Sequence, residues 1–175
     1  MIDTFDDVLV DPQAYRASTL RLPFQSIELS CITFHGIALP YDHSFRKWLE
    51  SQGLTPSLSF VRKSPAGQLE PHFVHSDADM GDWTAILYLN DPPMDGDGTS
   101  FWQSPTGAIR GAGVPPFERD AWQAWQHVTA RFNRCVVFDS TLYHSRAMPQ
   151  NYGDGDTARL IQVAFGQFQG ASRWL

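Results

Sequence analysis

Residues 71–77 read PHFVHSD, and residues 83–90, shortly after them, read WTAILYLN. In an extended chain alternate side chains point to the same side, so the first stretch presents the imidazole of His75 and the carboxylate of Asp77 to one point. The second stretch is rich in β-branched and aromatic residues and predicts a strand. Together they indicate a β-rich protein with two potential metal ligands beside one of its strands.

A third potential ligand follows another apolar run. Residues 135–144 read CVVFDSTLYH, which predicts a buried strand that enters a turn and delivers His144 at its far side. Two imidazoles and one carboxylate on one face of an ion form the facial triad, which suits Fe(II) and leaves positions open for other ligands. A His-x-Asp sequence alone is common by chance. The prediction that His75, Asp77 and His144 bind iron therefore depends on the combination.

A cation begins the last apolar run, DTARLIQVAFG at residues 156–166. The guanidinium of Arg159 is suited to hold a carboxylate of a dicarboxylic cosubstrate through a two-pronged pair. A structural ion pair at the end of a strand is the alternative interpretation of the same residue.

The rest of the chain alternates short apolar runs with Pro and Gly, which is typical of a sandwich or barrel. Helices are predicted from Asp11 at the N-cap through about Leu20, and over residues 41–52 before Gly53. Apolar residues at helical spacing also predict an inserted amphipathic helix over residues 118–132. Strands are predicted over residues 27–34, 57–63, 72–77, 83–89, 99–103, 134–139 and 159–168.

The bulk composition sets limits on the class of protein. A chain of 175 residues with 42% hydrophobic and 18% charged residues is expected to fold as one domain over residues 1–175. The net charge of -6 disfavours a nucleic-acid partner, because gripping a phosphate backbone draws on clustered Lys and Arg. The acidic N-terminus lacks a long apolar segment, so we expect no signal peptide, no membrane span and a cytoplasmic location.

The order of these motifs resembles a known family. His-x-Asp, a strand ending in Tyr-Leu-Asn at residues 88–90, GTSF at residues 98–101, an apolar strand, His and then Arg occur in the Fe(II)/2-oxoglutarate-dependent dioxygenases. The sequence looks most like the prolyl 4-hydroxylase-like branch and its uncharacterised bacterial relatives. The opening DDVLVDP at residues 6–12 is similar to the acidic, Leu-containing segment common there, so the resemblance spans nearly the whole chain.

The resemblance implies a mostly β fold, a double-stranded β-helix (a cupin-like jelly roll) with flanking α-helices. It also implies Fe(II) as the metal, 2-oxoglutarate as the cosubstrate, and Arg159 as the partner of the cosubstrate's distal carboxylate. Phe60 stands near the place where relatives often have a tyrosine that contacts the cosubstrate, which makes Tyr88 the candidate for that hydroxyl. The loop at residues 154–156 lengthens the interval before Arg159, so Arg146 and Arg62 remain rivals for the anchoring role.

The activity implied is oxygenation, with dioxygen as the oxidant and hydroxylation of a C–H bond as the outcome. A peptide side chain, a free amino acid and a small metabolite all fit as substrates. The first alternative is a cupin-like isomerase or hydrolase that uses another divalent metal on a similar barrel, because fold does not settle function. The second is a non-catalytic binding domain on the same scaffold. The sequence indicates neither the substrate nor the oligomeric state.

Overall fold

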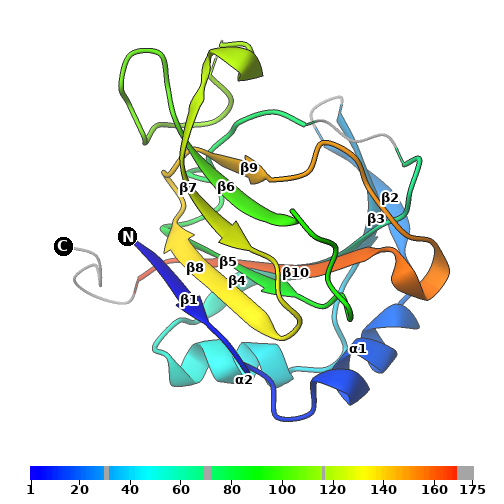
Figure 1. Cartoon of the computed structure of the whole chain (residues 1–175). Helices are drawn as coiled ribbons and strands as arrows, with labels where there is room; N and C mark the ends of the chain where they lie inside the picture. The colour runs from blue at the N-terminus through cyan, green and yellow to red at the C-terminus, as the bar shows by residue number, and fades with distance from the viewer. Residues whose placement is uncertain (30–31, 69–71, 116, 169–175) are drawn as a thin grey trace.

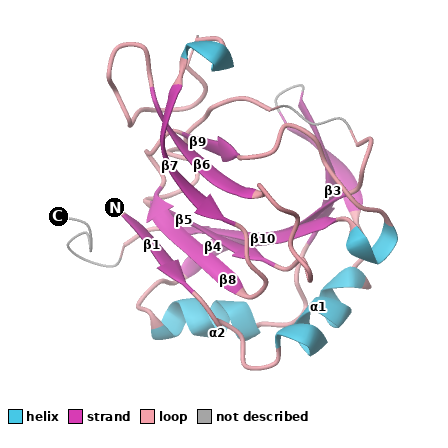
Figure 2. Cartoon of the chain, in the orientation of Figure 1, coloured by secondary structure: helices cyan, strands magenta, loops and turns pink. Residues whose placement is uncertain are grey.

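The structure is a computed structural model that describes residues 1–29, 32–68, 72–115 and 117–168. Strands predominate among these residues (Figures 1 and 2). The helices are α1 (Pro12–Leu20) and α2 (Ser44–Ser51), and short 3-10 turns lie at Arg119–Ala121 and Gly155–Thr157. The strands are β1 (Ile2–Phe5), β2 (Gln25–Leu29), β3 (Ile32–Ala38), β4 (Pro56–Ser64), β5 (Trp83–Tyr88), β6 (Gly98–Gln103), β7 (Gln123–Thr129), β8 (Arg134–Asp139), β9 (His144–Arg146) and β10 (Arg159–Gly166).

The strands form two antiparallel sheets. A seven-stranded sheet has the order β1-β8-β5-β10-β4-β3-β2, and a three-stranded sheet has the order β7-β6-β9. Figure 1 shows α1 and α2 on one side of the large sheet and the small sheet on its other side. This arrangement is the jelly roll with flanking helices that the sequence predicts.

Alternating side chains of the large sheet build two cores. On β10, Ile161 and Val163 point between the two sheets and pack with Phe101 of the small sheet. Their neighbours Leu160 and Ala164 join the other core. All eight residues of β10 are buried, because both faces of this strand are covered. A strand buried on both faces tends to be apolar along its whole length, and β10 was recognisable from the sequence because only Arg159 and Gln162 interrupt its apolar residues.

The first helix begins where the sequence predicts. Asp11 is the N-cap, its side chain accepts a hydrogen bond from the backbone N–H of Ala14 at 3.0 Å, and Pro12 occupies the first helical position. The Asp11 side chain pairs with one of the backbone N–H groups that have no partner within the first turn. Proline at the first position costs no helical hydrogen bond, because an N–H there would have no partner in the helix. The second helix is shorter than predicted and begins at Ser44.

The predicted helix over residues 118–132 is wrong. The chain makes a single 3-10 turn at Arg119–Ala121 and then enters β7, which pairs with β6 in a register that places Val128 opposite Thr99. Val128 and Ala130 are buried at a spacing of two, while Trp125 is 42% exposed. The aromatic and β-branched residues fit a strand as well as a helix, and the backbone hydrogen bonds to β6 decide between them.

Two strand boundaries also differ from expectation. The single strand predicted over residues 27–34 is the hairpin pair β2 and β3, and residues 30 and 31 between them lie outside the described residues. The strand predicted over residues 72–77 is reduced to an isolated bridge between His75 and His144. The short strands β1 and β9 were not predicted.

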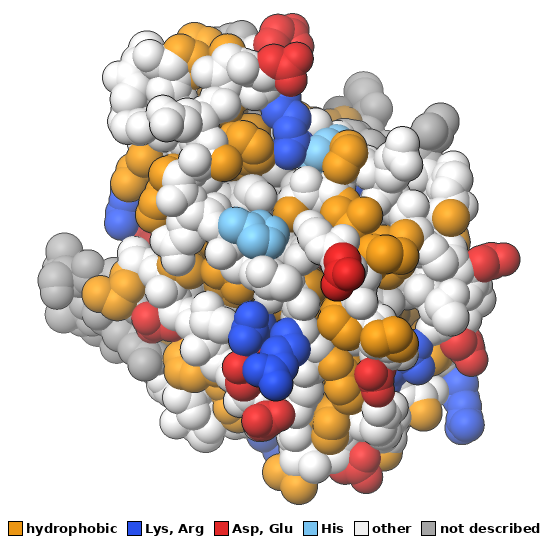
Figure 3. All heavy atoms as spheres, in the orientation of Figure 1, with side chains coloured by type: hydrophobic (Ala, Val, Ile, Leu, Met, Phe, Trp, Pro, Cys, Tyr) orange, Lys and Arg blue, Asp and Glu red, His pale blue; other side chains and the backbone are white. Residues whose placement is uncertain are grey.

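Charged groups of both signs share the face of the molecule shown in Figure 3. Surface ion pairs include Arg134 Nε with Asp6 Oδ1 at 2.6 Å and Arg131 Nη1 with Asp6 Oδ2 at 3.3 Å. None of the described helices has the length and apolar character needed to span a membrane.

Candidate metal centre

Backbone hydrogen bonds bring the two ligand segments together. The N–H of His75 donates to the carbonyl of His144 at 3.0 Å, and the N–H of His144 donates to the carbonyl of His75 at 2.8 Å. The N–H of Asp77 donates to the carbonyl of Ser140 at 2.8 Å. The segment before β5 and the turn after β8 are therefore held side by side at one end of the jelly roll.

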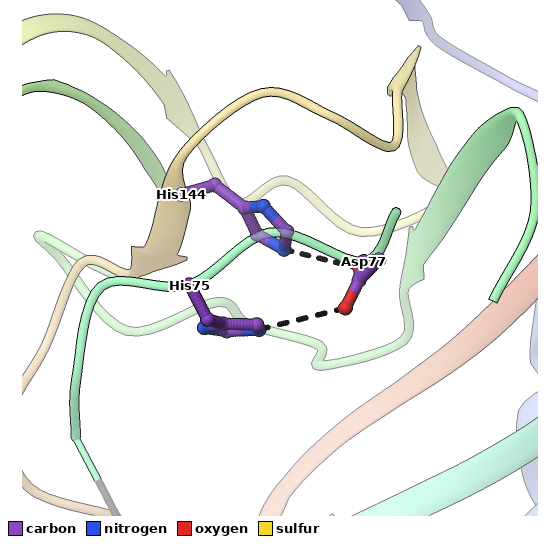
Figure 4. Close-up of side chains that lie close together, drawn as sticks. All are labelled: His75, Asp77 and His144. Carbon is purple, nitrogen blue, oxygen red and sulfur yellow. Dashed lines mark ion pairs between the residues drawn. The ribbon is translucent and has the colours of Figure 1, made fainter. Parts of the chain in front are cut away.

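The three side chains converge on one point (Figure 4). His144 Nε2 lies 3.2 Å from Asp77 Oδ2, and His75 Nε2 lies 3.7 Å from Asp77 Oδ1. One donor atom from each residue can be chosen so that all lie within 4.8 Å of one another. Two donors at right angles, each about 2.1 Å from an ion, are about 3 Å apart. The spacing of the three residues is thus compatible with a facial triad, and their role as metal ligands stays a prediction.

The orientation of each imidazole favours Nε2 as the metal-binding atom. His144 Nδ1 lies 2.9 Å from the carbonyl oxygen of Leu142, and His75 Nδ1 lies 3.3 Å from that of Phe73. A carbonyl oxygen accepts only from a protonated nitrogen, so these contacts place a proton on Nδ1 and make Nε2 the atom that could bind a metal ion.

Burial and charge set the protonation of the site. The side chains of His144, Asp77 and His75 are 5%, 15% and 33% exposed. Burial lowers the pKa of His75 to about 4, helped by the charges of His144 and Arg62 and opposed by that of Asp77. Burial would raise the pKa of Asp77, but His144, His75 and Thr84 outweigh it and the pKa falls. His75 is therefore neutral and Asp77 ionised near neutral pH, which are the forms that ligate.

The third candidate ligand, His144, differs from His75 in the direction of its pKa shift. Burial lowers the pKa of His144, but the charge of Asp77 and the hydrogen bond to it outweigh burial, so the net shift is upward. Aromatic rings enclose this imidazole, with the ring of Phe138 4.7 Å and that of Phe101 6.4 Å away between centroids. The enclosure keeps water from this side of the site.

Arg159 and Tyr88 lie in a separate buried polar cluster. Arg159 is 5% exposed, and its Nε donates to both carboxylate oxygens of Asp97 at 3.0 Å. Tyr152 donates to Asp97 Oδ2 at 2.8 Å, and the Tyr88 hydroxyl lies 2.7 Å from Thr99 Oγ1. The ion pair is the alternative that the sequence left open for Arg159. A role of Arg159 or Tyr88 in binding a cosubstrate stays a prediction.

The two rival arginines have different surroundings. Arg62 on β4 is paired with Ile161 of β10, and its charge contributes to the lowered pKa of His75. Its Cζ lies 5.8 Å from the centre of the Phe34 ring. Arg146 donates to the side chain of Asn151 and to the carbonyl of Pro149. Of the three arginines, Arg62 is the one whose charge contributes to the pKa shift of His75.

Sequence reasoning missed two residues next to the triad. Thr84 Oγ1 lies 3.2 Å from Asp77 Oδ2 and 2.9 Å from Ser140 Oγ. A hydroxyl inside the otherwise apolar or aromatic stretch WTAILY was the available signal. His72, by contrast, lies outside the triad, with its Nε2 3.0 Å from the carbonyl oxygen of Arg146.

Comparison with known proteins identifies the fold. No protein-family model matches the chain, and no curated protein matches it. The epimerase SnoN in complex with Fe3+, alpha ketoglutarate and nogalamycin RO is 15% identical, with a TM-score of 0.56 over 93% of this chain and 77% of that chain. The non-heme alpha ketoglutarate dependent carbocyclase SnoK is 14% identical, with a TM-score of 0.57 over 93% of this chain and 78% of that one. The chain shares their fold.

Proposed function

We propose that this chain is a non-haem oxygenase that depends on Fe(II) and 2-oxoglutarate. The observation that supports the proposal most is the convergence of His75, Asp77 and His144 within 4.8 Å, with both Nε2 atoms directed at the carboxylate. The names of SnoN and SnoK describe enzymes that use alpha ketoglutarate on this same fold. The three side chains would occupy one face of the metal's coordination sphere, which leaves three positions for other ligands.

Iron, when bound, would activate dioxygen for attack on a C–H bond, and 2-oxoglutarate would supply the two further electrons that the reduction of dioxygen requires. We propose hydroxylation, in which 2-oxoglutarate loses carbon dioxide, one oxygen atom of dioxygen enters the resulting succinate, and the other enters the product alcohol. Candidate substrates are a peptide side chain, a free amino acid and a small metabolite. The protein's own contribution is to hold the three ligands and to exclude water with rings such as Phe138 and Phe73, the latter 5.4 Å from the His75 ring.

For the distal carboxylate of the cosubstrate, we propose Arg62 as the first candidate and Arg159 as the second. The charge of Arg62 contributes to the pKa shift of His75, and β4 turns its side chain away from the core that contains its neighbour Val61. The charge of Arg159 is matched by Asp97. Tyr88 belongs to the same buried cluster as the second candidate, and the charge of Arg159 opposes the rise that burial causes in the pKa of Tyr88.

The first experiment is an anaerobic titration of the protein with Fe(II) and 2-oxoglutarate, followed by the visible charge-transfer band of a 2-oxo acid chelated to Fe(II). The wild type should develop the band, and His75→Ala, Asp77→Ala and His144→Ala should not. His127→Ala is the matched control, because His127 is exposed on β7. A folded, metal-bound wild type without a band would favour the cupin-like enzyme with another metal.

The same titration separates the two arginines. Arg62→Gln should raise the concentration of 2-oxoglutarate at half-saturation at least about tenfold, because a charged hydrogen-bond partner is lost. Half-saturation by 2-oxobutyrate, which lacks the distal carboxylate, should be unchanged in this variant. If Arg159→Gln or Tyr88→Phe weakens the binding of 2-oxoglutarate but not that of 2-oxobutyrate, the distal carboxylate is held near Tyr88, at the end of β5. If the protein bound 2-oxoglutarate equally well without iron, the result would favour a non-catalytic binding domain.

A further inference from the structure

Two buried hydroxyl groups form a hydrogen-bonded chain that ends at Asp77, one of the candidate metal ligands. Thr84 on β5 and Ser140, which follows β8, are both 0% exposed. Their side-chain oxygens lie 2.9 Å apart, and Thr84 Oγ1 lies 3.2 Å from Asp77 Oδ2. They come from different parts of the chain and meet because β5 and β8 pair, with Thr84 opposite Phe138.

The direction of these hydrogen bonds follows from the chemistry of the groups. An ionised carboxylate only accepts, so the Thr84 hydroxyl donates its hydrogen to Asp77. Since that hydrogen is used, Ser140 must donate to Thr84 Oγ1. The result is an ordered chain from Ser140 through Thr84 to Asp77, and the backbone carbonyl of Ser140 also accepts from the N–H of Asp77 at 2.8 Å.

The core itself does not require a hydroxyl at this position. Thr84 lies in WTAILY, a strand whose six residues are all buried. Valine has nearly the same shape and would avoid the cost of burying a polar group, which is about 1 to 3 kcal/mol when it is left unpaired. The hydroxyl is therefore better explained by its contact with Asp77 than by packing.

The contact acts on one oxygen of the carboxylate. Asp77 Oδ2 faces both Thr84 Oγ1 and His144 Nε2, at 3.2 Å each, while Oδ1 faces His75 Nε2 at 3.7 Å. A carboxylate bound through both oxygens would occupy a further coordination position. A 2-oxo acid needs two positions and dioxygen one, so a facial site can serve all of them only if the aspartate binds through a single oxygen.

We propose that Thr84, supported by Ser140, is a positioning residue that fixes the rotation of the Asp77 carboxylate, so that it offers one oxygen to the metal. The inference deepens the proposed function and rests on its assignment of Asp77 as a metal ligand. Outer-sphere partners of this kind orient the ligand and contribute to metal affinity.

The test uses Co(II) alone, titrated into metal-free protein and followed by its visible absorption. Thr84→Val should weaken Co(II) binding about tenfold and change the shape of the absorption spectrum. Thr84→Ser, which restores the hydroxyl, should return both to within twofold of wild type. Ser140→Ala should weaken binding by a smaller factor, about threefold, because it acts through Thr84. Thr19→Val is the matched control, since Thr19 is a buried threonine of α1.

Each outcome has a distinct meaning. Wild-type affinity and spectrum in Thr84→Val would overturn the proposal, and so would a Thr84→Ser variant as weak as the valine. A comparable loss in Thr19→Val would also overturn it, because the effect would then be general destabilisation. If Thr84→Val does not fold, as judged by circular dichroism, Ser140→Ala decides: unchanged Co(II) binding there contradicts the proposal. Unchanged binding in Asp77→Ala would instead refute the metal site itself.

Discussion

His144 Nε2 lies 3.2 Å from Asp77 Oδ2, and this contact joins two segments that flank the same end of a strand pair. Asp77 precedes β5 and His144 follows β8, and these strands pair with Trp83 opposite Asp139. The site is therefore assembled only when the large sheet is formed. A metal that binds this assembled site should in turn stabilise the fold.

Divalent metal should raise the stability of the wild type. At a free Co(II) concentration about one hundred times its dissociation constant, the free energy of unfolding should rise by about 2.7 kcal/mol. Urea unfolding with and without Co(II) measures this difference. The gain should vanish in His144→Gln and persist in His127→Gln, which alters an exposed histidine of β7. An equal gain in all three proteins would place the stabilising ion elsewhere.

Asp97→Ala should strongly destabilise the protein. Asp97 is 1% exposed and accepts from both Arg159 and Tyr152, so its loss leaves a buried guanidinium without its counter-charge. The expected cost is about 3 to 5 kcal/mol in urea unfolding. Asp95→Ala, in the exposed part of the same loop, should cost no more than about 0.5 kcal/mol. A cost below about 1 kcal/mol for Asp97→Ala would show that the ion pair is not structural.

Sequence patterns predicted the parts of this structure that local chemistry determines. The buried strands β5, β8 and β10 are mostly apolar runs, and Asp11 followed by proline is a local start signal for α1. The candidate triad could be proposed because His75 and Asp77 are close in sequence and His144 follows a recognisable strand. The candidate ligands thus came from short, local features, whereas the jelly roll was implied by the order of the motifs along the chain.

The remaining features depend on contacts between distant segments. Residues 123–129 form a strand because β6 supplies their hydrogen-bond partners, although Trp122, Trp125 and Val128 also match helical spacing. The pairing of Arg159 with Asp97 and that of Thr84 with Ser140 join residues far apart in the chain. Periodicity within one segment contains no information about such partners.

Gly36→Ala should be far more damaging than Gly53→Ala. Both glycines adopt left-handed backbone conformations, with φ of 66° and 77°. A Cβ at Gly36 would lie 1.9 Å from the carbonyl oxygen of Lys63 on β4, whereas one at Gly53 would have nothing within 4 Å. Each variant pays about 1 to 2 kcal/mol for the conformation, and Gly36→Ala adds about 1 to 3 kcal/mol for forcing β3 from β4. Equal losses in thermal unfolding would contradict this contact.

Asp139 should make the turn before His144 sensitive to acid. Its carboxylate accepts from the N–H of Thr141 at 2.9 Å, from its hydroxyl at 2.6 Å, and from Arg110 Nη1 at 2.5 Å. Burial raises the pKa of Asp139, but these contacts with Thr141 and Arg110 outweigh it and the pKa falls below its ordinary value of 3.8. The Asp139 carboxyl group therefore loses its proton more readily in the folded chain than in the unfolded chain.

The sign of the pH effect follows from this shift. A carboxyl group whose pKa is lower in the folded state contributes stability above its unfolded pKa and loses it as the pH falls through the folded value. Asp139→Asn should therefore cost about 1 to 2 kcal/mol at neutral pH, and the difference from wild type should shrink as the pH falls below about 4. Urea unfolding across this range measures it, with the exposed Asp95→Asn as the control. A difference that stays constant with pH would show that Asp139 acts through shape and not through its charge.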